Sequence, residues 1–243
     1  MTAYQILEEH QRLEEPSWRD IVFHYTLLTN DDLRSMGLPS SYVKGYSFGT
    51  FVVDQKYYMQ YLTNKLNGYG VTFVQQRLQS IDEIADNFDC VINCSGLGSA
   101  ALVADKDMYP IRGQVLRVKA PWLKAVWFFG TSYVIPNVDT VVLGGTAQKD
   151  DWSTTASLED TKTILDNACK VLPSIRRAPI ESIWVGLRPG RSPLRLERDL
   201  TDRSTAVIHC YGHGGSGITL AMGCADDVVL NYLAPLLKGE TVP

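Results

Sequence analysis

The sequence predicts an α+β fold built on a mixed sheet. Segments that look like antiparallel strands follow one another in the middle of the chain, over 112–121, 131–137 and 139–148, whereas strand–helix units lie at its flanks. A regular doubly wound sheet would alternate strands and helices throughout. At 243 residues, the chain is long enough for one large domain or two small ones.

Further strands are predicted on both sides of this central region. Residues 4–7, 46–54 and 71–78 are apolar or alternating, and residues 90–94 (CVINC) are apolar enough to be buried on both faces of a sheet. The segments IESIWVGLRPG and TAVIHCYG add two strands near the C-terminus. A glycine-rich turn after residue 94 leads into a short helical stretch.

Four helices are predicted from caps and apolar spacing. Residues 30–37 begin with an asparagine N-cap and end at a glycine, and Asp54 caps a helix that ends at Gly68. Residues 157–173 form an amphipathic helix with Ser157 in a capping box. The last helix runs from Ser216 to about residue 237.

The glycine pattern that opens the last helix suggests a site for negative charge. Gly212, Gly214 and Gly217 have the G-x-G-x-x-G spacing that cradles dinucleotide phosphates between a strand and a helix. Only 26 residues follow Gly217, so the second strand of a complete dinucleotide site is not expected. The helix N-terminus can still stabilise negative charge. A tight turn that needs positive φ is the alternative explanation.

Composition excludes several other kinds of function. A net charge of −4 disfavours nucleic-acid binding, and no apolar run is expected to reach the ~20 residues of a membrane span. The five cysteines are read as reduced core thiols, with no metal site. The N-terminus does not resemble a signal peptide, so a cytoplasmic or peroxisomal location is expected, with the cytosol as the default because the C-terminus is not a peroxisomal tripeptide.

Ordered motifs along nearly the whole chain resemble the D-amino-acid oxidase and D-aspartate oxidase family. The C-terminal segment TAVIHCYGHGGSGITLAMGCA is similar to the family's flavin motif. The others, in the family's order, are PSWRDIV, VINCSGLGSAAL, YPIRGQVLRVKAPW, SYVIP, VVLGGTAQKDDW and VGLRPGRSPLRLERD. The family's N-terminal dinucleotide-binding unit, with its own G-x-G-x-x-G, has no counterpart in the sequence.

The resemblance implies a flavoenzyme whose cofactor is FAD. Hydride would pass from the α carbon of a D-amino acid to flavin N5, and the products would be a 2-oxo acid, ammonia and hydrogen peroxide. The fold would be a mixed-sheet substrate domain plus the C-terminal part of an FAD-binding domain of the FAD-linked reductase type. The alternative is an inactive relative that cannot hold FAD because the N-terminal unit is missing.

The resemblance also assigns cofactor contacts. The C-terminal glycine loop would place a helix N-terminus near the pyrimidine side of the flavin, where its partial positive charge favours the reduced anionic ring. Leu78 would contact the adenosine half. The predicted cofactor-binding residues are Leu78, Ser95, Gly96, Gly214, Gly215, Ser216, Gly217, Ile218 and Thr219.

Arg188, Tyr133 and Gly215 are the predicted substrate-binding residues. A guanidinium in the apolar segment WVGLRPG must be paired, either with a buried carboxylate of the protein or, as the resemblance implies, with the substrate α-carboxylate. The Tyr133 hydroxyl would assist at the same carboxylate, although the tyrosine could instead simply pack on a sheet. The carbonyl of Gly215 would face the substrate amine.

Three further matches bear on which substrate is preferred. The first of the family's two active-site tyrosines falls on Phe129, and the arginines that grip an acidic side chain fall on Val126 and Ala147. Neither of these two residues can bind a carboxylate, which favours neutral D-amino acids, although Lys124 or Lys149 could substitute.

The resemblance also divides the chain into three segments. Residues 1–110 would be a partial FAD-binding domain, 111–185 the substrate-binding domain, and 186–243 the flavin-contacting loop and helix. The expected partners are a small-molecule D-amino acid and O₂, with no nucleic acid and no membrane, and a homodimer is compatible with the family.

Overall fold

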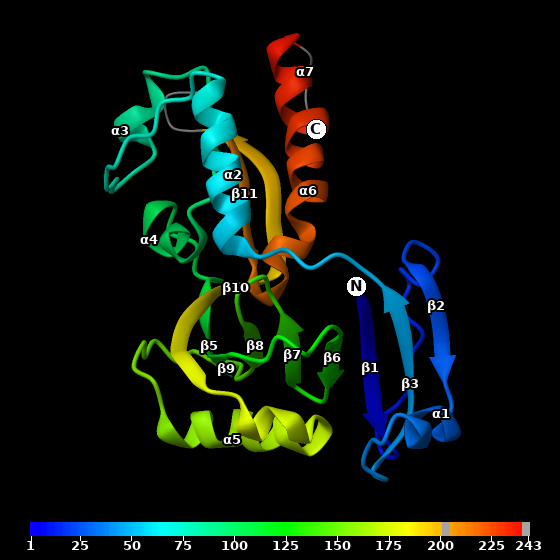
Figure 1. Cartoon of the computed structure of the whole chain (residues 1–243). Coiled ribbons are helices and arrows are strands. Elements are labelled where there is room, and N and C mark those ends of the chain that lie inside the picture. The colour runs from blue at the N-terminus through cyan, green and yellow to red at the C-terminus, as the bar shows by residue number, and fades with distance from the viewer. Residues whose placement is uncertain (201–204, 240–243) are drawn as a thin grey trace. The chain divides into compact units, whose positions relative to one another are not determined.

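A computed structural model describes residues 1–200 and 205–239 as two compact units (Figure 1). Unit 1 contains residues 1–70, 113–147 and 154–186, and unit 2 contains the remainder. The two long strands β5 (Tyr109–Val118) and β10 (Ile180–Leu200) contribute residues to both. The α+β class with a mixed sheet is confirmed, and the division into three functional segments stays a prediction.

Unit 1 is built on a mixed sheet. Its strands lie in the order β2-β3-β1-β6-β7-β8-β5, and β1 runs parallel to β6 but antiparallel to β3. Every other neighbouring pair in this order that shows a register is antiparallel. The bounds are β1 Thr2–Glu8, β2 Phe23–Leu28, β3 Tyr42–Gly49, β6 Val126–Phe129, β7 Ser132–Pro136 and β8 Val141–Gly144.

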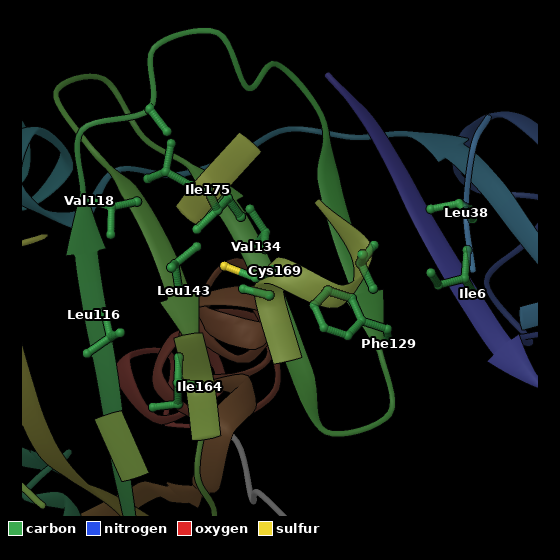
Figure 2. Close-up of a cluster of buried hydrophobic side chains, with 14 of the residues drawn as sticks. Ile6, Leu38, Leu116, Val118, Phe129, Val134, Leu143, Ile164, Cys169 and Ile175 are labelled. Carbon is green, nitrogen blue, oxygen red and sulfur yellow. The ribbon is translucent and has the colours of Figure 1, made fainter. Parts of the chain in front are cut away.

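Helix α5 (Leu158–Val171) covers the strands of unit 1 with its apolar face. Ile164, Ala168 and Cys169 are buried against apolar side chains from the sheet, as Figure 2 shows for two of them. A 3-10 turn over Pro173–Arg177 adds Ile175 to the same cluster. This packing is the main apolar core of the unit.

The N-terminus of α5 is fixed by a buried glutamine. The Ser157 side chain accepts a hydrogen bond from the Asp160 amide at 3.2 Å, which confirms the predicted cap. The Gln114 side chain accepts from the Ser157 amide at 2.7 Å and donates to its carbonyl at 2.8 Å. The first of these bonds satisfies a backbone N–H that a helix leaves open at its N-terminus.

Helix α2 (Gln55–Gly68) has the same length as α5 but a different environment. Asp54 caps it as predicted, with its side chain accepting from the Lys56 amide at 3.2 Å. None of the α2 side chains is buried against the part of the chain that the structure describes. Its apolar residues therefore contribute little to the core of unit 1.

Unit 2 contains a three-stranded layer and a long C-terminal helix. Strand β11 (Ala206–His213) pairs antiparallel with β10 and parallel with β4 (Cys90–Asn93). The two-residue strand β9 (Gln148–Lys149) pairs with β5 at Arg112. Its helices are α3 Asp82–Ala85, α4 Ser99–Leu102, α6 Gly217–Asp227 and α7 Ala234–Leu237, the last two joined by a π-helical stretch over Val228–Leu233.

Several predicted elements have different limits in the structure. The segment 71–78 was expected to be a strand but is irregular, because no strand of the described residues pairs with it. The strand predicted for 46–54 ends at Gly49. Strand β4 is not buried on both faces, because it lies at the end of the strand order and leaves Ile92 43% exposed.

Helix α1 (Asn30–Ser35) begins at the residue that was predicted to be its cap. Thr29, rather than Asn30, is the N-cap, because its side chain accepts from the Asp32 amide while the Asp32 carboxylate accepts from the Thr29 amide. This reciprocal pair is a capping box. The predicted stop is confirmed, since Gly37 has φ +74.

The C-terminal helix is longer and more apolar than the sequence suggested. It runs without a break over Gly214–Leu237, is largely apolar and is almost unburied within the described residues. By length and composition this helix could cross a membrane, so the expectation that no segment reaches such a length was wrong. The helix contains two acids, Asp226 and Asp227, and one helix of this kind is weak evidence of a membrane span.

Candidate flavin and carboxylate site

The glycine loop is a sharp strand-to-helix connection in unit 2. Gly212 and Gly214 have φ +90 and +56, conformations that only glycine adopts easily. A Cβ atom added to Gly212 would also lie 2.6 Å from Cβ of Arg191. The turn explanation is therefore correct at these two positions, and any ligand role of the loop is additional to it.

The helix that follows the loop begins without a side-chain cap. Neither the 3-10 turn over Gly214–Ser216 nor α6 receives a capping hydrogen bond from a side chain of the described residues. Gly215, Ser216, Ile218 and Thr219 are exposed. The amino end of a 24-residue helix thus presents backbone N–H groups and a partial positive charge to a ligand.

Arg188 lies against this loop. It is half-buried on β10, and its Cδ lies 3.7 Å from the position of a Cβ built on Gly215. A fixed positive charge therefore stands beside the helix N-terminus. Both features favour an anionic ligand group in the same place.

A third loop completes the convergence. Gly96 has φ +56, and a Cβ on it would lie 3.6 Å from Cβ of Pro189, the neighbour of Arg188. Ser95 is held by its amide, which donates to Asn93 Oδ1 at 3.1 Å, and by a 2.7 Å hydroxyl contact with Ser99. The structure thus brings together residues 95–96, 188 and 214–217, which are distant in sequence.

Tyr133 has well-defined surroundings within unit 1. It lies on β7 opposite Gly144 of β8. A Cβ on Gly144 would overlap the tyrosine ring, and one on Gly145 would lie 3.1 Å from the hydroxyl oxygen. The two glycines of the GGTAQ motif therefore leave room for the ring, and the assignment of Tyr133 to substrate stays a prediction.

Leu78 lies in the irregular segment of unit 2 and is half-buried. None of the contacts described above involves it. Its assignment to the adenosine half of FAD also stays a prediction.

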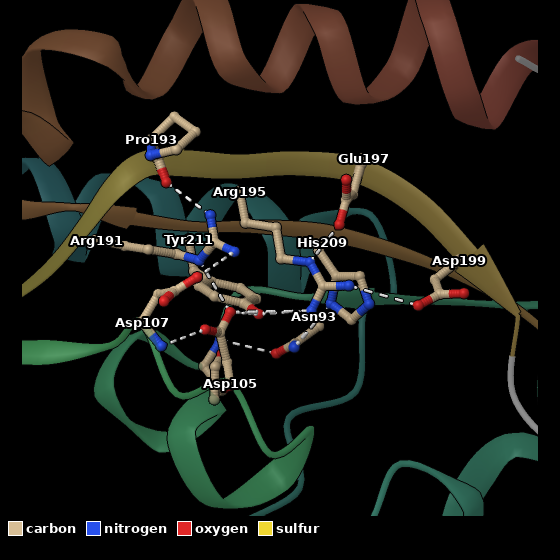
Figure 3. A network of polar contacts seen from close by, with 12 residues as sticks. Asn93, Asp105, Asp107, Arg191, Pro193, Arg195, Glu197, Asp199, His209 and Tyr211 are labelled. Carbon is tan, nitrogen blue, oxygen red and sulfur yellow. Dashed lines mark hydrogen bonds and ion pairs between the residues drawn. The ribbon is translucent and has the colours of Figure 1, made fainter.

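A buried ion-pair network fixes the strand that carries Arg188 (Figure 3). The Asp105 carboxylate accepts from Arg191 Nε at 2.9 Å and from the Tyr211 hydroxyl at 2.7 Å. Arg195 donates to the same hydroxyl at 2.9 Å. Arg191 and Arg195 lie on β10 and Tyr211 on β11, so the network ties the two strands together three residues after Arg188.

The network shifts the pKa of Asp105. Burial alone would raise this pKa, but hydrogen bonds from Tyr211, the Asp107 amide and Arg191 outweigh burial and hold it below the ordinary value. Asp105 is therefore ionised at neutral pH and compensates the two arginines.

His209 and Asn93 connect β11 to β4. Asn93 Nδ2 donates to His209 Nδ1 at 3.1 Å, so the neutral imidazole carries its proton on Nε2. Burial, followed by the charge of Arg195, lowers the pKa of His209. The His209 imidazole is therefore neutral near pH 7 and is engaged by Asn93.

The sequence did not point to this network. Asp105 follows a short apolar helix and belongs to no motif. Arg191 and Arg195 stand an even number of residues apart in RSPLRLERD, which could have indicated a polar strand face. A cavity of about 300 Å³, lined by Asp82, Arg195 and His209 among others, includes none of the predicted site residues. We therefore place the candidate site at the three converging loops.

These loops suit a flavin. An uncapped helix N-terminus, two glycines at φ +56 that allow close approach and a neighbouring guanidinium suit a planar ring that becomes anionic on reduction, with a carboxylate next to it. Gly214–Thr219 with Ser95 and Gly96 would hold the ring.

Comparison with known proteins identifies the family. Residues 3–229 match the model of the FAD dependent oxidoreductase family. The chain is 40% identical over 204 residues to D-amino acid oxidase of Dugesia ryukyuensis, covering 81% of this chain and 61% of that protein. It is 35% identical over 230 residues to human D-aspartate oxidase, covering 93% of this chain and 67% of that protein.

The solved structure of glycine oxidase from Geobacillus kaustophilus has the same fold. It superposes with a TM-score of 0.78 at 18% identity, covering 99% of this chain and 71% of that one. The chain thus spans roughly two thirds of the length of the relatives named here. The chain belongs to the family of FAD-dependent oxidoreductases that includes the D-amino-acid and D-aspartate oxidases.

Proposed function

We propose that the protein takes part in FAD-dependent oxidative deamination of a D-amino acid. The observation that carries this proposal is the position of the Arg188 side chain beside Gly215, where a carboxylate-binding group lies next to an uncapped helix N-terminus. The names of the relatives support the same chemistry. They give no support to the alternative of an inactive binding fragment.

The residues of this chain would orient the substrate. Arg188 would hold the α-carboxylate in a bidentate fork, and the Gly215 carbonyl would accept a hydrogen bond from the substrate amine. FAD, when bound, would accept the hydride from the α carbon and return both electrons to O₂ as hydrogen peroxide. The α6 N-terminus would stabilise negative charge that develops next to it. The imino acid would then be hydrolysed to a 2-oxo acid and ammonia.

We further propose that neutral D-amino acids are preferred over acidic ones. Val126 and Ala147 offer no charge for a side-chain carboxylate. The Lys149 ammonium lies 4.3 Å from the centre of the Tyr109 ring, a cation–π contact that occupies it.

Peroxide release from the purified chain with added FAD tests the proposal. We expect more peroxide from D-alanine than from D-aspartate, and none from L-alanine. Arg188→Lys should lower kcat/KM, because the bidentate fork is lost while the charge remains. The loss should correspond to about 2–5 kcal/mol of transition-state stabilisation. The exposed Arg177→Lys is the matched control and should leave the rate unchanged. A chain that stays colourless and inactive with FAD would contradict the proposal.

A further inference from the structure

Unit 2 contains a thiol–imidazole cluster that the proposed oxidase chemistry does not use. A ring nitrogen of His213 and the sulfur atoms of Cys210 and Cys224 all lie within 4.8 Å of one another. His213 Nε2 is 3.4 Å from Cys224 Sγ. All three residues are half-buried.

Two neighbouring elements bring these side chains together. Cys210 and His213 lie on β11, and Cys224 lies on α6. Residues three apart in a regular strand point to opposite faces. Gly212, with φ +90, breaks this alternation just before the strand ends. The side chains of Cys210 and His213 can therefore lie in the same cluster.

The spacing suits a tetrahedral ion of the zinc class. With Zn–S and Zn–N bonds of about 2.3 and 2.0–2.1 Å, a tetrahedral site separates a sulfur from a nitrogen ligand by about 3.6 Å. The 3.4 Å contact between His213 and Cys224 is close to this value. Thiolate and imidazole are also the ligands that zinc prefers in structural sites.

A fourth ligand is available at the edge of the cluster. The thiol of Cys94, directly after β4, lies near enough to interact with that of Cys210, although it is not among the atoms that all lie within 4.8 Å. Cys94 is exposed, so an ion could reach the cluster from its side. We propose that Cys210, His213 and Cys224 bind one divalent ion of the zinc class, with Cys94 as the fourth ligand.

Such an ion would have a structural role. It would join β11 to α6, the two elements that the glycine loop connects. Helix α6 has no side-chain cap of its own. The ion would therefore fix the turn that places the helix N-terminus. This conclusion differs from the expectation, drawn from the cysteine spacing, that the chain has no metal site.

Cobalt titration of the reduced, metal-free whole chain tests the site without FAD or substrate. We expect saturation at about one Co²⁺ per chain, with a thiolate-to-cobalt charge-transfer band and the visible bands of tetrahedral cobalt, and displacement by Zn²⁺. Cys210→Ser and Cys224→Ser should each weaken binding at least about tenfold. Cys90→Ser is the matched control, since Cys90 lies on β4 outside the group, and should bind as the unaltered chain does.

Far-ultraviolet circular dichroism of each metal-free variant separates lost ligands from lost fold. Absence of the cobalt bands from the folded, unaltered chain would overturn the proposal. So would bands that persist in the Cys210→Ser/Cys224→Ser double variant. Loss of two titratable thiols on exposure to peroxide, without any metal binding, would show that the cluster forms a disulfide instead.

Discussion

Single residues in unit 2 combine charge with burial, and Asp105 is the clearest case. Its side chain is 4% exposed and touches Arg191 and the Tyr211 hydroxyl, which Arg195 also contacts. A buried carboxylate that is so fully paired stabilises a fold mainly by compensating its partners, because removing it leaves their charges uncompensated. The network thereby secures the strand on which Arg188 lies.

We expect Asp105→Asn to lower the free energy of unfolding by about 3–5 kcal/mol near neutral pH. The folded-state pKa of Asp105 is depressed, so its contribution is present above the unfolded pKa of about 3.9 and is lost as the pH falls through the folded value. Urea denaturation at several pH values measures this difference.

Asp107→Asn is the matched control for Asp105. Its carboxylate lies 3.5 Å from Arg191 Nη2, but its side chain is 69% exposed, so solvent screens the pair. We expect a change of at most about 1 kcal/mol. Equal losses in the two variants would show that the buried network adds nothing beyond surface charge.

At the scale of elements, local signals predicted helices better than strands. Ser157 and Asp54 were correct as caps because a cap depends on a few neighbouring residues. The segment 71–78 was wrong as a strand, since strand formation requires a partner and no periodicity reveals whether one is present. Strand β6 was not predicted for the same reason, because its short segment is defined by its pairing with β1 and β7.

The helices α5 and α2 contain the same number of residues but should differ in energetic weight. Ile164 on α5 is 2% exposed within the apolar cluster, whereas Met59 on α2 is 53% exposed. We expect Ile164→Ala to cost about 2–5 kcal/mol and Met59→Ala at most about 0.5 kcal/mol. Urea denaturation followed by tryptophan fluorescence measures both. A Met59 variant as unstable as the Ile164 variant would show that α2 has an apolar partner.

At the scale of the whole molecule, the sequence predicted the family and the residues of the glycine loop, but not the network beneath them. The spacing of these glycines was visible because positive φ at Gly212 and Gly214 restricts the residue types that can stand there. The contacts of Asp105, Tyr211 and Cys210 join residues that are far apart in the chain. They depend on how β10, β11 and β4 pair, which no local pattern specifies.

The two units should respond differently to acid. His209 and Asp105 both belong to unit 2, and the pKa of each is lowered in the folded state. A lowered histidine pKa means that the folded form favours neutral imidazole, so its contribution is present above the unfolded pKa and is lost as the pH falls below about 6.5. The groups that face His209 are Asn93, Tyr211, Arg195 and the acids Glu197, Asp199 and Asp105. Burial and the charge of Arg195 lower its pKa by more than the three acids raise it.

We therefore expect acid to loosen unit 2 before unit 1. Between about pH 7 and pH 5, amides of β11 and β4 should lose protection from hydrogen exchange, after correction for intrinsic rates, while those of β7 and β8 keep it. His209→Gln should reduce this pH dependence, because glutamine does not titrate. His10→Gln is the matched control, since His10 is exposed in unit 1 and its ring lies 3.6 Å from the Glu8 carboxylate on the surface. Uniform loss of protection in both units would show that they unfold together, and an unchanged profile in His209→Gln would assign the acid response to other groups.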